Sequence, residues 1–169
     1  MKVLYNGNYK QIHSAVEDAN ELYDSEIFYE NIARHPGFSC SKKAPKEIAQ
    51  IMKESYLEIE VKLYRPKWKR SKVLGYFIRS YPTTIFLNSR KIYRETNSIT
   101  NTIVHECVHA LDNSLNSKII EFGHNCGYFK NTAPYEIGNI AESIIDGGII
   151  ESIEMPPDTF ETIELDRII

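Results

Sequence analysis

The feature that most constrains this sequence is a pair of histidines four residues apart, His105 and His109, inside an amphipathic helix pattern. Apolar residues recur at helical spacing from residue 99 to residue 111. On a helix, residues four apart lie on one face, one turn above the other. The sequence therefore predicts a buried central helix that carries two neighbouring imidazoles, with Glu106 beside them.

The rest of the chain predicts helices around a small group of strands. We expect helices over residues 11–33, 45–53 and 134–150, a loop over 116–133, and strands over 56–64, 73–80 and 83–88. Strands grouped between helices, rather than alternating with them, are typical of the α+β class. We expect a short, mostly antiparallel or mixed sheet packed on the central helix.

Length and composition indicate one folded domain. The chain has 169 residues, of which 42% are hydrophobic and 25% are charged. It is therefore long enough to bury a hydrophobic core without the help of disulfides or structural metals. We expect a single domain over residues 1–155 and an acidic tail over 156–169, after two prolines. No apolar run reaches the roughly 20 residues of a membrane helix, so no membrane partner is expected. The N-terminus turns polar too early for a signal peptide, and three cysteines form an odd count typical of a reducing compartment. These features predict a cytoplasmic protein.

The net charge of −3 hides an asymmetry. Residues 1–130 carry 19 Lys and Arg against 14 Asp and Glu, a net of +5, whereas residues 131–169 carry one Arg against nine acids, a net of −8. The stretch Lys62–Lys72 holds six positive residues with Tyr64 and Trp68 between them. Basic grooves with stacking aromatics suit single-stranded nucleic acid, which makes DNA a possible partner. The alternative is a solvated loop beside an edge strand, where lysines discourage aggregation.

The segment from His105 to His109 is an H-E-x-x-H motif, and its residue types suit metal chemistry. Two imidazoles on one helix face can ligate one Zn²⁺ ion, which lowers the pKa of its bound water to about 7. Glu106 then lies where it can take a proton from that water. The alternative is an ordinary amphipathic helix with two surface or capped histidines. The motif lies in an apolar helix, and three of the five histidines fall within residues 105–124, which favours a metal site.

A catalytic zinc site needs a third protein ligand, for which the sequence offers several candidates. Leu115 occupies the position of a metzincin's third histidine, which excludes that class. Asp112 is one turn past the motif and is expected to be a helix-end acid. His124 follows the motif by fifteen residues, and Glu142 with Asp146 has the spacing of a glutamate ligand and its supporting acid.

Cys126, Tyr128 and Tyr135 are weaker candidates for the metal site. Cys126 could be a soft zinc ligand, although a lone cysteine there is more often structural. Tyr128 or Tyr135 could place a phenol near the metal to stabilise an oxyanion. Cys107 faces away from the histidines and is expected to be a small core residue.

Residues from about 60 to 130 resemble the SprT-like zinc metallopeptidases, the group that includes Spartan-type DNA–protein crosslink proteases. The matching pieces are Lys67–Arg70 with Leu74–Gly75, Ile85–Asn88, Thr102–Ala110, Gly123–His124, and Tyr128 with Lys130. The resemblance implies a zincin-like fold and assigns His124 as the third zinc ligand. No cysteine follows Cys126, so we do not expect the family's usual C-terminal zinc ribbon here, and residues 131–155 do not match the pattern. Glu142 therefore stays open as the alternative ligand.

Together these features predict a zinc-dependent endopeptidase acting on a protein or peptide substrate. His105, His109 and His124 would hold the metal, and Glu106 would be the general base. An extended substrate would add to the edge strand nearest the central helix, for which we expect 83–88. The alternatives are a catalytically silent zincin-like binding module and a zinc amidase acting on a non-peptide bond.

Overall fold

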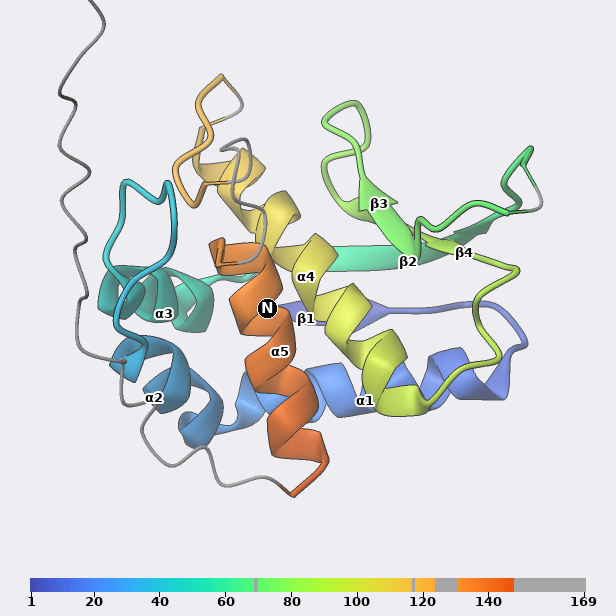
Figure 1. Cartoon of the computed structure of the whole chain (residues 1–169), viewed down its shortest axis with the longest axis horizontal. Helices are drawn as coiled ribbons and strands as arrows, with labels where there is room; N and C mark the ends of the chain where they lie inside the picture. Colours follow the sequence, from blue (N-terminus) through green and yellow to red (C-terminus); the bar gives the residue numbers. More distant parts are fainter. Residues whose placement is uncertain (69, 117, 124–130, 148–169) are drawn as a thin grey trace, which may run out of the picture.

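Five helices and four strands make up the part of the chain that this computed structural model describes, residues 1–68, 70–116, 118–123 and 131–147. In chain order they are β1 Lys2–Leu4, α1 Lys10–Asp24, α2 Glu26–Arg34, α3 Pro45–Glu54, β2 Glu58–Tyr64, β3 Gly75–Phe77, β4 Thr84–Asn88, α4 Thr96–Leu115 and α5 Ala133–Ile145 (Figure 1). The strands fall together in the middle of the chain apart from β1, which the sequence pattern did not predict. The α+β class is confirmed.

The strands form one mixed sheet in the order β1-β2-β4-β3. β2 pairs in parallel with both β1 and β4, and only β3 runs antiparallel to its neighbour β4. The expected mixed sheet is therefore confirmed, but the expectation of mostly antiparallel pairing is wrong. The expectation that 83–88 is an edge strand is also wrong, because β4 lies between β2 and β3. The edge strand beside the central helix is β3, which is shorter than the predicted 73–80.

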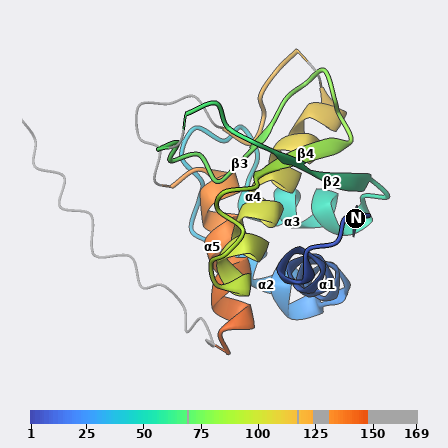
Figure 2. The same ribbon diagram turned by 90° about the vertical axis from the view of Figure 1, so that its right-hand side faces the viewer.

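The helices gather on one side of the sheet, as Figure 2 shows. α4 contacts β2, β3 and β4 and also packs against α1 and α5, so it is the central helix of the fold. Its apolar stripe is buried at Ile99, Ile103, Val104, Cys107, Val108, Ala110 and Leu111. β2 buries Ile59 and Val61 against the same core and exposes the alternate positions Glu58 and Lys62. The prediction of a sheet packed on the motif-bearing helix is confirmed.

The predicted helix over 11–33 is two helices, α1 and α2, with a break at Ser25. The backbone of Ser25 is extended (φ −95°, ψ 124°), and its N–H donates to the carbonyl of Leu22 instead of continuing the helix. α2 packs against α3 and α5. The break thus lets Phe28 and Ile32 of α2 reach the core from a new direction, and both are fully buried.

The starts of α3 and α5 agree with the sequence. α3 begins at Pro45, and the Glu47 carboxylate accepts a hydrogen bond of 2.8 Å from the N–H of Ala44. α5 begins at Ala133 and ends at Ile145, followed by Gly147 with φ +73°. A positive φ suits glycine, because an L side chain there would be strained. The predicted end at residue 150 is therefore too late, because the chain leaves the helix after Ile145; residues 148–150 lie outside the described part.

No helix among the described residues is both long and apolar enough to cross a membrane. Cys107 is a free, buried thiol, as expected for a core residue. Cys40 is disulfide-bonded, which the odd cysteine count did not lead us to expect. The predicted roles of His124, Cys126, Tyr128 and Lys130, and the acidic tail over 156–169, fall on residues outside the described part.

Candidate metal centre

Helix α4 brings the two imidazoles of the motif to within bonding reach of a common ion. Nε2 of His105 and Nε2 of His109 lie 3.3 Å apart, and their ring planes make an angle of 71°. Two nitrogens bound to one tetrahedral ion at about 2.05 Å would lie about 3.3 Å apart. The distance between these two nitrogens therefore matches the distance between two ligand atoms on a tetrahedral metal ion.

Glu106 completes a group of three potential ligands on the same helix. Ligand atoms of His105, Glu106 and His109 all lie within 4.8 Å of one another, and this is the one such group found among the described residues. The Glu106 side chain is buried, with 7% of the residue exposed. Burial raises its pKa to about 8, and a backbone hydrogen bond from Phe77 opposes the rise. The group is compatible with a metal ion, because a nearby cation favours the carboxylate form.

The three side chains line a cleft of about 360 Å³. One wall is the edge strand β3, with Tyr76 and Phe77, continued by Arg79 of the loop that follows. The opposite wall is formed by Ile119 and Ile120 after α4 and by residues on α4 and α5. The cleft thus lies beside a sheet edge, next to the histidines.

The free edge of β3 follows from its pairing with β4. The N–H of Asn88 donates to the carbonyl of Leu74 at 2.9 Å, so this pair of residues is hydrogen-bonded. Bonded and non-bonded pairs alternate along an antiparallel ladder, so Gly75 and Phe77 direct their backbone groups away from β4. Phe77 uses its N–H for Glu106, which ties the edge strand to the motif.

Tyr135 at the start of α5 contacts the motif directly. Its ring meets that of His105 edge to face, with centroids 4.5 Å apart and planes at 80°. Tyr135 is also 41% exposed and lines the cleft. The sequence offers Tyr135 beside Tyr128 as a candidate, and the packing of α5 along α4 brings it to the histidines.

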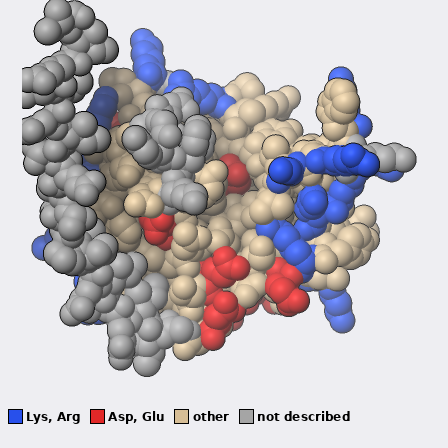
Figure 3. Space-filling model, viewed as in Figure 1, with Lys and Arg blue, Asp and Glu red and all other residues tan. Residues whose placement is uncertain are grey.

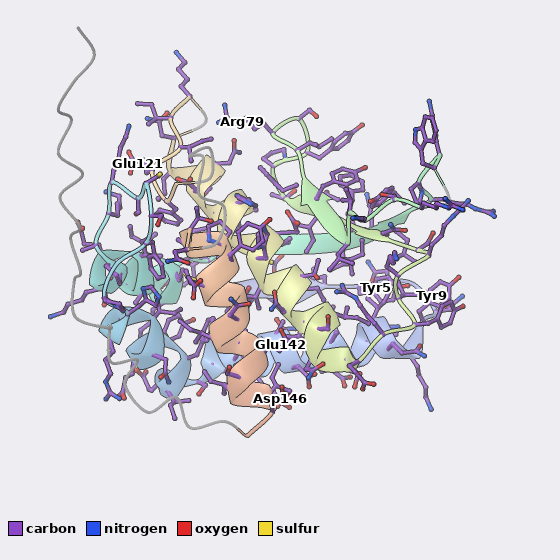
Figure 4. The ribbon with its side chains drawn as sticks, viewed as in Figure 1. Tyr5, Tyr9, Arg79, Glu121, Glu142 and Asp146 are labelled. Atoms are coloured by element: carbon purple, nitrogen blue, oxygen red, sulfur yellow. The ribbon has the colours of Figure 1, made fainter. Side chains whose placement is uncertain are left out.

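The same packing places Glu142 and Asp146 further along the helix pair. Glu142 accepts a 2.6 Å hydrogen bond from Asn101, one turn before His105, and Asp146 accepts one of 2.6 Å from Asn97, a turn earlier still. Figure 4 shows both acids on the lower half of α5. The cluster of potential ligands among the described residues does not include Glu142.

Asp112 holds the chain that follows α4. Its carboxylate accepts backbone hydrogen bonds from Glu121 (3.0 and 3.2 Å) and from Phe122 (3.1 Å). Burial raises the pKa of Asp112, and these hydrogen bonds oppose the rise. Asp112 lines the cleft, but its carboxylate is occupied by hydrogen bonds from the loop backbone, which agrees with the expected helix-end role.

The loop around residues 39–42 anchors the chain on both sides of residues 124–130. The N–H of Lys42 donates to the carbonyl of Glu121 at 2.8 Å, and the N–H of Ser39 donates to that of Asn131 at 2.7 Å. Gly123 has φ +79°, and a Cβ there would lie 2.6 Å from the backbone of Cys40. Glycine is therefore required at the position immediately before His124.

The basic stretch Lys62–Lys72 borders the sheet on the side away from α5. Figure 3 shows lysines and arginines gathered over this side and acidic residues gathered below, near the start of α4 and the end of α5. Tyr64 meets Tyr76 edge to face, and Tyr76 stacks on Phe86 at 4.9 Å between centroids. Trp68 is 83% exposed. Trp68 and the basic residues of this stretch that the structure describes are thus exposed, as either interpretation requires.

No model of a known protein family, no curated protein and no solved structure matches this chain. The resemblance to SprT-like metallopeptidases therefore depends on the sequence motifs, and the function must be argued from the site itself.

Proposed function

We propose that this protein is a zinc-dependent metallopeptidase with a zincin-like fold. The observation that carries the proposal is the 3.3 Å separation of the His105 and His109 Nε2 atoms beside the buried carboxyl of Glu106. Two nitrogens at tetrahedral spacing with an acid next to them suit a catalytic zinc rather than a structural one, since structural sites are usually closed by cysteines.

In this proposal the metal and the protein side chains have different roles in the hydrolysis. Zinc, when bound, polarises a carbonyl and lowers the pKa of its water to about 7. Glu106 is the general base in this proposal: it takes a proton from the attacking water and delivers it to the leaving amine. The backbone N–H of Phe77 orients the Glu106 carboxylate through their hydrogen bond.

The proposed third ligand is His124, with Glu142 as the alternative. The hydrogen bond between Glu142 and Asn101 favours His124, because it commits the Glu142 carboxylate one turn away from His105. We expect His124→Ala to lose most of its bound zinc and Glu142→Ala to retain it, measured by atomic emission after dialysis. The reverse pattern would make Glu142 the ligand, and equal retention would remove both assignments.

The proposed substrate is a peptide in extended conformation along β3, in place of the strand first expected to receive it. Gly75 and Phe77 direct backbone groups toward the open side of the strand, and an added strand would pair with those that remain free. A peptide in this position would lie next to Glu106, because the backbone of Phe77 is hydrogen-bonded to that carboxyl.

We further propose DNA as a partner of the stretch Lys62–Lys72, supported by the exposure of Trp68.

The direct test is Glu106→Gln. We expect this variant to retain zinc and lose hydrolysis of a denatured protein substrate, because glutamine cannot accept the proton. The matched control is Glu95→Gln, an exposed acid just before α4 that should leave both properties unchanged. Full activity in Glu106→Gln would refute the mechanism. Zinc binding by the wild type without hydrolysis of any peptide or amide would favour the silent binding module.

A further inference from the structure

One cation faces the proposed peptide path. Among the described residues that line the cleft, Arg79 is the only lysine or arginine, and the acids there are Glu106 and Asp112. Arg79 is exposed and follows β3 by two residues. Figure 4 shows it between the loop after β3 and the C-terminal end of α4.

Neither acid in the cleft is a close partner for this guanidinium. Glu106 is the proposed base, and Asp112 accepts three hydrogen bonds from the backbone of its own loop. Arg79 does lower the pKa of Asp112, but it is the weakest of the influences that act on that group. No ion pair between described residues involves Arg79. The simplest structural role, a salt bridge that fixes the loop, is therefore not observed in the described part of the chain.

The loop nevertheless holds Arg79 in place through its backbone. The N–H of Tyr81 donates to the carbonyl of Ile78, and the N–H of Thr84 donates to that of Tyr81, both at 3.0 Å. These bonds make a tight connection between β3 and β4. An arginine whose backbone is fixed in this way loses less conformational entropy on binding a ligand than an arginine on a flexible segment.

The part of the cleft lining formed by Ile119 and Ile120 is apolar. Ile119 is 43% exposed. A peptide in the cleft would therefore meet a cation at Arg79 and an apolar surface at Ile119 and Ile120. A planar guanidinium binds carboxylates through two parallel hydrogen bonds, which gives direction as well as charge recognition.

We propose that Arg79 is a specificity-determining residue that binds a carboxylate group of the substrate. The cleft would then select peptides that carry an acidic group near the scissile bond. This inference rests on the proposed peptidase function. Phe77 contacts Glu106, and Arg79 follows it by two residues. At about 3.3 Å per residue, the carboxylate belongs within roughly two positions of the bond that is cut. It comes from an Asp or Glu side chain or from the C-terminus of the peptide.

The test compares quenched fluorogenic peptides that carry Glu, Gln or Lys at each of three positions on either side of the cleaved bond. A second pair of peptides ends near that bond in a free carboxylate or an amide, which separates the two sources of the carboxylate. We expect one position at which Glu exceeds Gln about tenfold in kcat/KM. Arg79→Gln should abolish the preference by lowering kcat/KM for the Glu peptide to the value for the Gln peptide, and Arg79→Glu should favour Lys. Lys118→Gln, an exposed cation outside the cleft lining, is the matched control.

A binding arm keeps this result separate from the peptidase proposal. The Glu106→Gln protein, with and without zinc, is titrated into labelled Glu and Gln peptides, and fluorescence anisotropy gives their Kd values. If the wild type cleaves nothing, the peptidase proposal fails, but tighter binding of the carboxylate peptide that is lost with Arg79→Gln still supports this inference. Equal binding of the two peptides, a preference that survives Arg79→Gln, or no measurable binding would overturn it.

Discussion

Replacing Glu106 by glutamine is expected to stabilise the metal-free protein above neutral pH, although it removes the proposed catalytic base. The Glu106 side chain is buried, and burial raises its pKa from 4.5 to about 8. An acid whose pKa is raised by folding contributes stability that is fully present below its unfolded pKa. This contribution is lost as pH rises through the folded pKa. Glutamine has the same shape and does not ionise, so it keeps the packing without this loss.

The magnitude follows from the size of the pKa shift. A shift from 4.5 to about 8 corresponds to a total loss of about 5 kcal/mol, since each unit is worth about 1.4 kcal/mol. The wild type should therefore have lost about 3 kcal/mol of this contribution by pH 7 and most of it above pH 8.

Urea unfolding in the presence of a chelator, followed by circular dichroism at half-unit steps from pH 4.5 to 8.5, measures this difference. The free-energy gap between Glu106→Gln and wild type should widen steadily toward high pH, and added zinc should close it by favouring the wild-type carboxylate. Glu95→Gln, which replaces an exposed acid, should show no such trend. A gap that stays constant with pH would refute the reasoning that burial controls the charge of Glu106.

Other consequences can be measured on the same protein. Asp112→Ala should lower the free energy of unfolding by about 2–4 kcal/mol, because two backbone N–H groups lose their acceptor, and Asp112→Asn should cost less. Gly138→Ala should cost about 1–3 kcal/mol in the same urea assay, because a Cβ would lie 2.6 Å from Oδ1 of Asn101. Ser143→Ala on the same helix is its control, and an equal effect would contradict the packing argument. Cys107, whose pKa burial raises to about 12, should resist iodoacetamide at pH 8 until denaturant is added, as measured by mass spectrometry.

The sequence predicts what depends on neighbours along the chain. The spacing of His105 and His109 needs only helical geometry, so their proximity was predictable before any tertiary structure. The start of α3 was predictable for the same reason, since Pro45 and Glu47 act within one turn. The break at Ser25 was not, because apolar spacing continues across it with no glycine or proline to mark it.

The order of the strands depends on contacts between segments that are distant in sequence. The edge position predicted for residues 83–88 from the sequence pattern was therefore wrong. β1 has only three residues and pairs with a strand more than fifty positions away, so nothing local marks it. β4 did carry a usable signal. All of its residues except Phe86 are buried, and continuous burial is typical of an interior strand rather than an edge. The two cleft residues brought in by tertiary packing, Tyr135 and Arg79, had no signal of comparable strength.

The short edge strand explains how the parts of the site come together. A Cβ at Gly75 would lie 2.8 Å from Cγ2 of Thr102 on α4, so glycine lets β3 approach the helix closely. This approach allows the N–H of Phe77 to reach Glu106, and two residues further on Arg79 lines the cleft. Side chains two apart on a strand share a face. Because of this period, a register slip of one residue between β3 and β4 would turn Gly75 and Phe77 away from α4 together. Pairing with β4, rather than any residue of the motif, therefore fixes the position of the proposed peptide path relative to the proposed base.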